Sequence, residues 1–536
     1  MIKKNILFLV VTIFFYFSTF AHSQVKVYNL DLNTDLKKEQ NLKKSLLKDK
    51  VFFTFAQNET RSICFAVESS EQIDNLTIDF VIDYNKLTNN EDMKVELFYL
   101  KYWYQSGSHT VYNRSISNYV AELLVKDYSL IKVDYDNKIN YLKIVDEYNN
   151  EKYVEITSKD ALFDKKWKIN DAKNLSRLSL SKNAQLNIFS DIKIGKNVLP
   201  GFYKANFNIY SNDKIIHTVP IVINILDIAL GEPVSSTAIY YRAKINTGYI
   251  QGVGSEEKSI FQYESEMQDL IDHGVQFPTI HQRFITLNLE LNIRKKLNFN
   301  TQYIYYLDGT GKPSSKSDYK SLAKRVKRIV KISRHYGYEN IHIHGIDEAR
   351  GDILTSERRA FEVVQSSGGK VFKACYDDAL ALVGDLLDTP ILYAPNNENQ
   401  TPMWKSKGKR VYAYGNPQVG IEDYSLNRRQ FGFYLFANGF DGSMPYAYQH
   451  GFNNIWNDYD HEFRDHNFTY PLTNGLVSTV QWKGYREGVN DLRYVKYLID
   501  NKNYDADKLK IEILEMLKND ESCDAIRSLL IKKILT

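Results

Sequence analysis

The sequence predicts a multidomain protein: an N-terminal antiparallel β-sandwich, then a (β/α)8 TIM-type barrel, then a C-terminal helical extension. Three observations predict this fold class. Short alternating apolar runs fill residues 25–230, strands alternate with helices from about residue 233, and helical patterns end the chain. The expected divisions are a signal peptide at 1–23, a sandwich at 24–232, a barrel at 233–451 and a loop with a helical cap at 452–536.

The first 23 residues have the pattern of a secretory signal peptide. Lys3 and Lys4 form a charged start, residues 6–20 are almost entirely apolar, and residues 21–23 (Ala-His-Ser) form a small-x-small cleavage site. The alternative is an uncleaved anchor, but the apolar run is short for a span of about 20 residues. We therefore expect a mature chain that begins at Gln24, is secreted or periplasmic, and has no membrane association after cleavage.

Composition excludes several classes of function. The chain has 69 basic and 65 acidic residues, and this balance predicts no nucleic-acid or membrane partner. The three cysteines, Cys64, Cys375 and Cys523, are far apart and are interpreted as packed thiols. Residues 461–466 (His-Glu-Phe-Arg-Asp-His) have one residue too many between the histidines for a zinc helix motif. We expect no metal and no cofactor, and the sequence does not predict an oligomeric state.

The sandwich is predicted from ten short runs that are separated by turns rich in Asn, Asp, Gly and Lys. The runs are Val25–Leu30, Val51–Phe55, Ile63–Val67, Leu76–Ile82, Val95–Tyr104, Tyr119–Val125, Tyr153–Ile156, Gln185–Phe189, Tyr203–Tyr210 and Ile215–Leu226. No residues here have a catalytic spacing. A support domain is the favoured interpretation, and a dedicated sugar-binding module is the alternative.

The barrel is predicted from eight strands with amphipathic segments between most of them. The strands are Thr237–Ile245, Gln276–Gln282, Thr301–Asp308, Asn340–Gly345, Lys370–Tyr376, Pro390–Pro395, Lys409–Asn416 and Gly442–Gln449. The helix at Ser317–Tyr336 is the clearest, because its apolar residues share one face. An open doubly wound sheet is the alternative. Further helices are expected at Val489–Ile499, Asp507–Leu517 and Asp524–Leu535.

An acidic pair, Asp347 and Glu348, follows the fourth barrel strand. In this strand Ile341 and Ile343 alternate with two histidines that we expect to pack inside the barrel. The carboxyl end of a barrel strand is where such folds carry their chemistry. Two ordinary loop acids near a helix start are the alternative interpretation.

The pair fits the chemistry of glycoside hydrolysis. Glu348 can protonate a glycosidic oxygen, but a retaining enzyme normally needs a second carboxylate about 5 Å away. The seventh strand ends at 412–416 without an acid, while Glu422 and Asp423 stand at an apparent helix start. This pattern suggests substrate assistance, in which a 2-acetamido group attacks its own anomeric carbon. Asp347 would hold the acetamido N–H, and Glu348 would protonate the leaving oxygen and then activate water.

Three segments carry a family resemblance. Residues 344–348 (His-Gly-Ile-Asp-Glu) resemble the His-x-Gly-x-Asp-Glu region of substrate-assisted hexosaminidases such as glycoside hydrolase family 20. The sandwich that ends in 200–203 (Pro-Gly-Phe-Tyr), and the late segment 486–491 (Arg-Glu-Gly-Val-Asn-Asp), are more similar to glycoside hydrolase family 123, the β-N-acetylgalactosaminidases. Gln481 departs from the basic residue expected before the last helices.

The resemblance implies an exo-acting retaining hexosaminidase that releases a terminal β-linked N-acetylhexosamine, GalNAc favoured, from an oligosaccharide or polysaccharide. Two rivals remain open. One is a barrel glycosidase on a non-acetylated sugar with Glu422 as the second carboxylate. The other is a glycan-binding protein that has lost catalysis.

Eight further residues are candidates for substrate contact, although each has an alternative role in packing, in an ion pair or as a helix N-cap. They lie near the ends of predicted barrel strands or supply aromatic walls for a sugar ring. They are Arg242, Asp377, Tyr393, Trp404, Tyr414, Tyr446, Tyr448 and Trp482.

Overall fold

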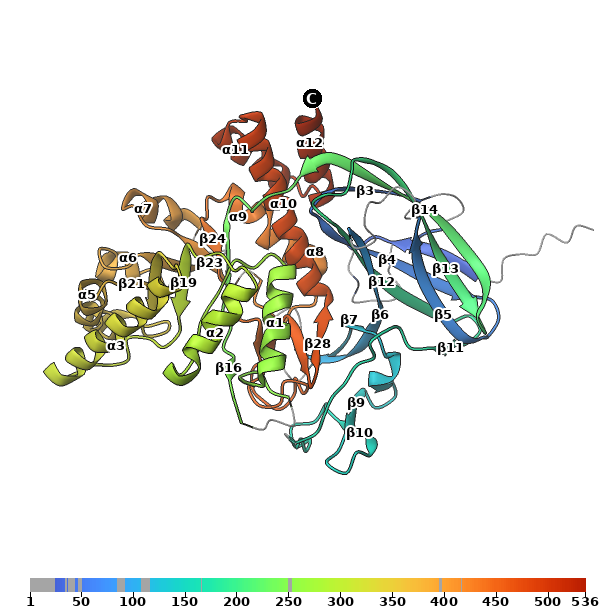
Figure 1. The fold of residues 1–536 in the computed structure, drawn as a ribbon, viewed down its shortest axis with the longest axis horizontal. Helices are drawn as coiled ribbons and strands as arrows, with labels where there is room; N and C mark the ends of the chain where they lie inside the picture. The colour runs from blue at the N-terminus through green and yellow to red at the C-terminus, as the bar shows by residue number, and fades with distance from the viewer. Residues whose placement is uncertain are drawn as a thin grey trace, which may run out of the picture.

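The protein has two β-sheet layers on one side and an α/β barrel on the other (Figure 1). The computed structural model describes residues 25–33, 36, 44–46, 51–83, 92–107, 116–164, 166–248, 253–394, 398–415 and 417–536. The predicted signal peptide lies outside these residues. Among the described residues, no helix combines the length and apolar character that crossing a bilayer requires.

Two sheets pack face to face to form the sandwich, and their inner side chains share one hydrophobic core. The first sheet has the order β2 (Lys44–Leu46), β1 (Val25–Leu30), β4 (Thr60–Ser69), β12 (Gln185–Ile194), β6 (Met93–Ser106), β7 (Ser117–Val125), β28 (Gly475–Thr479) and β27 (Thr469–Leu472). The second has the order β11 (Leu178–Leu180), β5 (Ile73–Ile82), β13 (Gly201–Ser211), β14 (Lys214–Ala229) and β3 (Val51–Gln57). Strands β3 and β14 run parallel, which departs from the purely antiparallel prediction.

Two features of the sandwich were not predicted. The segment 131–155 forms a separate small sheet of β8 (Ile131–Asp134), β9 (Ile139–Val145) and β10 (Glu151–Glu155), so the run predicted at Tyr153–Ile156 forms a strand that belongs to neither layer of the sandwich. In addition, β27 and β28 come from residues beyond the barrel, yet β28 pairs with β7 of the first sheet. The segment expected to be a barrel cap therefore also completes the sandwich, because an edge strand is stabilised by any segment that can pair with it.

The eight predicted barrel strands are all present and parallel. In barrel order they are β15 (Ser236–Ile239), β18 (Phe277–Pro278), β19 (Tyr303–Tyr306), β20 (Asn340–His344), β21 (Lys370–Cys375), β22 (Thr389–Tyr393), β23 (Tyr412–Tyr414) and β24 (Gly442–Ser443). A single bridge between Ile280 and Tyr306 joins the second strand to the third and nearly closes the ring. The alternative of an open sheet is not observed.

At least one helix follows each barrel strand, as the alternating pattern predicts. The helices are α1 (Ile260–Asp272), α2 (Phe284–Lys296), α3 (Lys316–His335), α4 (Gly351–Ser356), α5 (Arg358–Ser366), α6 (Ala379–Val383), α7 (Thr401–Ser406), α8 (Tyr424–Phe431) and α9 (Phe433–Ala437), then α10 (Val480–Lys502), α11 (Ala506–Lys518) and α12 (Cys523–Leu535). Helix α3 shows how the sequence specifies them. Ser315 and Asp318 form a capping box, and Leu322, Val326 and Ile329 are buried on one face.

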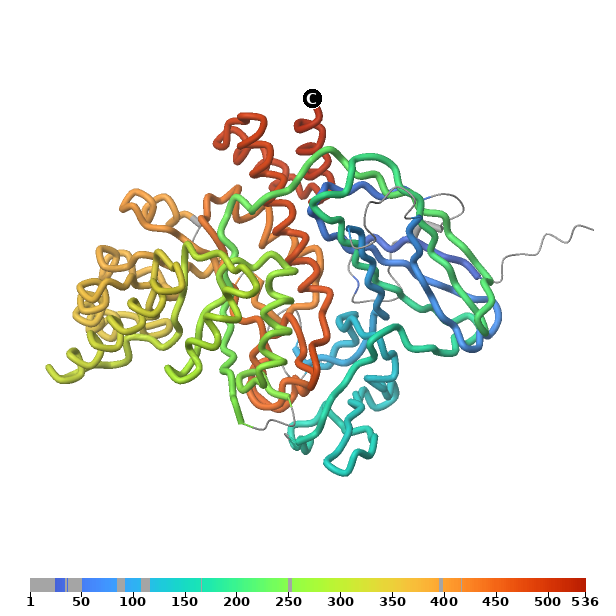
Figure 2. The backbone as a smooth tube through the Cα atoms, viewed as in Figure 1, coloured from blue at the N-terminus to red at the C-terminus, as the bar shows by residue number. Residues whose placement is uncertain are grey.

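Helix α10 lies between the sandwich and the barrel (Figures 1 and 2). It begins nine residues before the predicted start, because Thr479 caps it by accepting a hydrogen bond from the backbone N–H of Trp482. Gly432 and Gly488 let helices α8 and α10 approach closely, since a Cβ at Gly488 would lie 2.6 Å from the carbonyl oxygen of Arg428. Arg486 of α10 forms a buried ion pair at 2.6 Å with Asp191 of β12.

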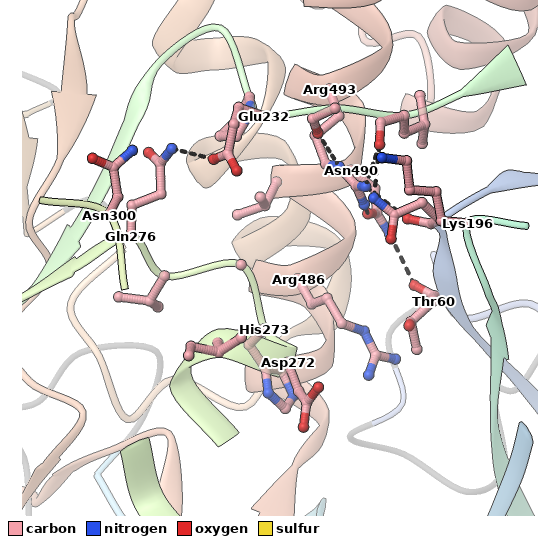
Figure 3. A pocket seen from close by; sticks show the side chains of 18 of the residues that line it. Thr60, Lys196, Glu232, Asp272, His273, Gln276, Asn300, Arg486, Asn490 and Arg493 are labelled. Atoms are coloured by element: carbon pink, nitrogen blue, oxygen red, sulfur yellow. Dashed lines mark hydrogen bonds between the residues drawn. The ribbon is translucent and has the colours of Figure 1, made fainter. Parts of the chain in front are cut away.

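A cavity of about 870 Å³ lies at the junction of sandwich, barrel and α10 (Figure 3). Its barrel residues, such as Gln276 and Asn300, come just before β18 and β19, so the cavity is at the amino end of the barrel. Its polar side chains are largely engaged. The guanidinium of Arg493 donates to three backbone carbonyl oxygens, and Asn490 donates to the carbonyl of Thr60. We interpret this cavity as a hydrogen-bonded domain junction.

Candidate active site

The Asp347–Glu348 pair follows β20 directly and lies at the carboxyl end of the barrel. Both side chains are exposed, while the strand behind them is buried. Glu348 has a φ of 47°, a left-handed backbone conformation that is uncommon for a residue other than glycine. The tight turn therefore places two adjacent carboxylates in solvent at the barrel mouth.

Two tyrosines hold the carboxylate of Glu348. The hydroxyl of Tyr376, just after β21, donates to Oε2 at 2.6 Å, and that of Tyr414, at the end of β23, donates to Oε1 at 2.7 Å. Burial raises the pKa of both tyrosines, and the bond to Glu348 raises it further. The tyrosines therefore remain protonated donors at neutral pH. The guanidinium of Arg350 lies over the ring of Tyr376, 3.2 Å from its centroid, and fixes that ring in turn.

Asp347 is more open. Its side chain is 69% exposed, and it makes no direct hydrogen bond to a neighbouring ring: His344 Nε2 is 3.9 Å away. Partial desolvation by the surrounding protein raises the pKa of Asp347, and the negative charge of Glu348 raises it further. The positive charges of Lys373 and Arg242 oppose this rise. Burial lowers the pKa of His344 to about 3, so this imidazole is neutral. Asp347 is thus free to accept a hydrogen bond from a ligand.

Arg242, Tyr446 and Tyr240 lie on the side of the mouth next to Asp347. Arg242 forms an ion pair with Glu256, with nitrogen–oxygen distances of 2.6 and 3.0 Å, so the predicted alternative role is realised. The charges of Arg242 and Asp347 both act on Tyr446, whose pKa is raised mainly by burial. The Tyr240 hydroxyl is buried without a hydrogen-bond partner, and its pKa is raised by burial and by Asp347.

Two more predicted residues lie near the mouth without touching the acidic pair. The ring of Tyr393 is 36% exposed and packs edge-on against Tyr414, with centroids 5.5 Å apart. Asp377 is exposed and accepts a hydrogen bond at 2.9 Å from the side chain of Gln400. Both can contact a ligand that extends from the pair.

Three predicted contact residues are not brought to the mouth. Trp404 of α7 is fully buried in the core between the strands and the outer helices. Tyr448 and Trp482 are buried in a separate core, where both donate to Oδ2 of Asp269 at 2.8 Å. These rings are therefore corrected to structural roles, because their large apolar area is already covered by protein.

Glu422 is also committed elsewhere. Its carboxylate is buried and pairs with Arg464 at 3.0 Å, and Arg464 also pairs with Asp458 at 3.3 Å. The charge of Glu422 acts on buried Glu122 of the sandwich strand β7. Asp423 caps helix α8, as its position at a helix start predicts. Glu422 is thus held in a buried polar cluster that faces the sandwich.

Sequence reasoning missed Tyr376 and the residues behind the acidic turn. Tyr376 had a usable signal, because Phe372 and Ala374 belong to the interior core of the barrel and alternation puts residue 376 on the same side. No sequence pattern could have identified Glu357 and Lys373, because these two side chains meet only through the packing of helix α5 on strand β21.

The described residues contain no group of three or more His, Cys, Asp or Glu side chains arranged to hold a metal ion. The arrangement that they do contain is an exposed carboxylate beside a second one held by two hydroxyl donors. Such a pair can transfer protons and stabilise a cationic centre.

Comparisons with known proteins agree with this geometry. Residues 278–498 match the family model described as "Glycoside hydrolase 123, catalytic domain". No curated protein matches the chain. A solved structure of a family 123 glycoside hydrolase from Clostridium perfringens, described in terms of glycolipid glycan hydrolysis, is similar over 95% of this chain and 96% of that one, with 13% identity and a TM-score of 0.59.

Two other solved structures are much less similar. An endo-β-N-acetylglucosaminidase from Cordyceps militaris has a TM-score of 0.30 at 11% identity, with 49% of this chain and 91% of that one covered. A xyloglucanase from Bacteroides ovatus has a TM-score of 0.29 at 8% identity, with 82% and 98% covered. At such low TM-scores, these two likenesses do not bear on the fold.

Proposed function

We propose that this chain is a glycoside hydrolase of the family 123 type and that it removes a terminal β-linked N-acetylhexosamine from a glycan. The single observation that carries the proposal is the exposed Asp347 directly beside a Glu348 whose two oxygens each accept a tyrosine hydroxyl. The first carboxylate is open to a ligand N–H, and the second is aimed for proton transfer.

The proposed reaction retains the anomeric configuration. Glu348, in its protonated form, donates a proton to the glycosidic oxygen while the 2-acetamido oxygen attacks the anomeric carbon and the leaving group departs. Asp347 accepts a hydrogen bond from the acetamido N–H and stabilises the positive charge of the resulting oxazolinium ring. Glu348, now a carboxylate, takes a proton from water as that water attacks the same carbon, which restores both groups.

The site and the family resemblance support this substrate class. An acetamido group would supply an N–H donor to the exposed carboxylate of Asp347, which lies 3.9 Å from His344 Nε2. The family resemblance favours GalNAc over GlcNAc, and the C. perfringens enzyme is described as acting on glycolipid glycans. An oligosaccharide, or the glycan of a glycolipid, is therefore the proposed natural substrate.

The test is release of p-nitrophenol from the β-GalNAc, β-GlcNAc and β-galactoside derivatives by the purified chain from Gln24. Turnover of an N-acetyl sugar alone, reduced about 100- to 1,000-fold in Asp347→Asn, would support substrate assistance, since one electrostatic stabiliser contributes about that much. Glu348→Gln should be at least as damaging. Turnover of the plain galactoside at an equal rate would remove the acetamido mechanism and reopen the search for a second carboxylate.

If no p-nitrophenol is released from any of the three substrates, the result would favour a protein that binds glycans without catalysis. In that case the parent and Glu348→Gln would bind an oligosaccharide equally on a glycan array.

We also propose that the chain is exported and cleaved before Gln24. The support is the sequence pattern of residues 1–23. N-terminal sequencing of the protein recovered outside the cytoplasm tests this, and a first residue other than Gln24 would contradict the cleavage site.

A further inference from the structure

An ion pair between Glu357 and Lys373 contacts the backbone on both sides of the Asp347–Glu348 turn. The backbone N–H of Ile346, just before Asp347, donates to Oε1 of Glu357 at 2.6 Å. The Lys373 ammonium donates to the carbonyl of Ala349, just after Glu348, at 3.4 Å. Glu357 Oε2 and Lys373 Nζ are 3.9 Å apart. The two charged side chains therefore hydrogen-bond to the backbone just before Asp347 and just after Glu348, and they form an ion pair with each other.

This pair is hidden from solvent. The side chains of Lys373 and Glu357 are 0% and 2% exposed. Lys373 lies on β21 between Val371 and Cys375, which belong to the core between strands and helices, so it points out of the barrel toward the start of α5. Neither side chain is open to the mouth of the barrel, so the contacts of both with the acidic pair pass through the turn that they hold.

The surroundings leave the turn little room to shift. Thr310 donates its hydroxyl to Glu357 Oε1 at 3.2 Å and its N–H to the carbonyl of His344 at 2.8 Å. A Cβ at Gly309 would lie 2.7 Å from that same carbonyl oxygen, and one at Gly345 would lie 3.2 Å from the ring of Phe361. The loop after β19 therefore packs against the backbone of the turn, while helix α5 meets the turn through the Phe361 ring.

A buried ion pair is a costly way to hold a turn. Taking both charges out of water costs several kcal/mol per ion, and apolar residues of similar volume are often as stabilising. Burial raises the pKa of Glu357, while the Ile346 N–H, Lys373 and Thr310 oppose that rise. The pair is thus poorly explained by stability alone and better explained by what it positions.

We propose that Glu357 and Lys373 are positioning residues that hold Asp347 and Glu348 in the reactive geometry, including the left-handed backbone of Glu348. This inference rests on the proposed function for its kinetic consequence. Lys373 has a second effect through its charge. Asp347 faces Glu348, the cations Lys373 and Arg242, and the neutral ring of His344, so removing Lys373 takes away one of the two positive charges that oppose the rise in the pKa of Asp347.

The test uses three variants and one control of the full chain from Gln24. Glu357→Gln keeps an oxygen acceptor for Ile346 but removes the charge, and Lys373→Met removes the ammonium. The double variant leaves no unpaired buried charge, so it is the one expected to fold best. Asp385→Asn is the control, because it removes a partly exposed ion pair to Arg358, the first residue of α5, without touching the turn.

Hydrogen–deuterium exchange of peptides that cover 345–351 reports on the turn without any substrate. The proposal expects exchange of the Ile346 amide to accelerate about tenfold or more in Lys373→Met and in the double variant, and not in Asp385→Asn. Unchanged protection in both would overturn the proposal, whether or not the enzyme cleaves N-acetyl sugars.

Kinetics supply the second readout. We expect kcat to fall about 10- to 100-fold with KM changed less than about threefold, since a small misplacement of reacting groups costs that much. In Lys373→Met the acid limb of the kcat profile should also move to higher pH, because the pKa of Asp347 rises without the cation. A merely structural role would lower the melting temperature and leave the acid limb in place. If turn exchange accelerates but no substrate is cleaved by the parent, the proposed function fails and the positioning role stands.

Discussion

Replacing Tyr414 with phenylalanine removes one hydroxyl and little else. That hydroxyl donates to Glu348 Oε1 at 2.7 Å, and its ring is buried at the end of β23. The phenyl ring can keep its packing against Tyr393, so the variant should fold. The change isolates one of the two bonds that orient the proposed general acid.

The expected magnitude follows from the strength of that bond. A hydrogen bond to a charged group contributes about 1.5–3 kcal/mol, and 1.4 kcal/mol corresponds to tenfold in rate. We therefore expect kcat/KM on an N-acetylhexosaminide to fall about 10- to 100-fold, mostly in kcat, because this hydroxyl donates to Glu348, the proposed general acid.

Tyr412→Phe is the matched control on the same strand. Its hydroxyl accepts from Tyr305 at 3.0 Å inside the barrel and does not reach Glu348. We expect the control to lose stability by about 1 kcal/mol, the cost of an unpaired buried donor, and to keep kcat/KM. Steady-state kinetics and thermal melts of both variants decide the matter. A Tyr414→Phe enzyme within twofold of the parent would refute the assignment of Tyr414 as an orienting residue.

Three further predictions concern buried charges. Burial raises the pKa of the Asp465 carboxyl well above its ordinary value, so the folded state should lose stability as the pH rises through that pKa. The substitution Asp465→Asn should therefore raise the melting temperature more at pH 8 than at pH 5. A larger increase at pH 5 would contradict this prediction. Asp191→Asn leaves Arg486 buried without its carboxylate and should cost about 3–5 kcal/mol in urea unfolding; a loss below about 1 kcal/mol would show that the pair is dispensable. Glu422→Gln should destabilise the chain through Arg464 yet keep kcat/KM within about threefold, whereas a loss of 100-fold would revive Glu422 as a catalytic carboxylate.

The order of strands and helices in the barrel could be predicted because it rests on local patterns. Alternation of apolar residues identifies each strand, and the 3.6-residue period identifies helices such as α3. The Asp347–Glu348 pair could be predicted for a related reason, since the carboxyl end of a barrel strand has a defined meaning in this architecture.

Which candidate residues reach the pair was settled only by tertiary packing. Tyr414 and Tyr446 lie beside it, whereas Trp404 and Trp482 are buried in cores, although all four are aromatic residues near predicted element ends. An aromatic side chain suits a sugar-binding cleft and a core equally well, so its type carries no information on which it joins.

The sequence by itself therefore determined a sandwich, a barrel and an acidic pair at a strand end, because periodicity and strand-end position are read along the chain. Only the tertiary structure decided that Tyr376 and Tyr414 converge on Glu348, that Glu357 and Lys373 grip the turn, and that β28 completes the N-terminal sheet. These contacts join residues between 11 and about 350 positions apart. No local pattern encodes such pairings, because they depend on how whole elements pack.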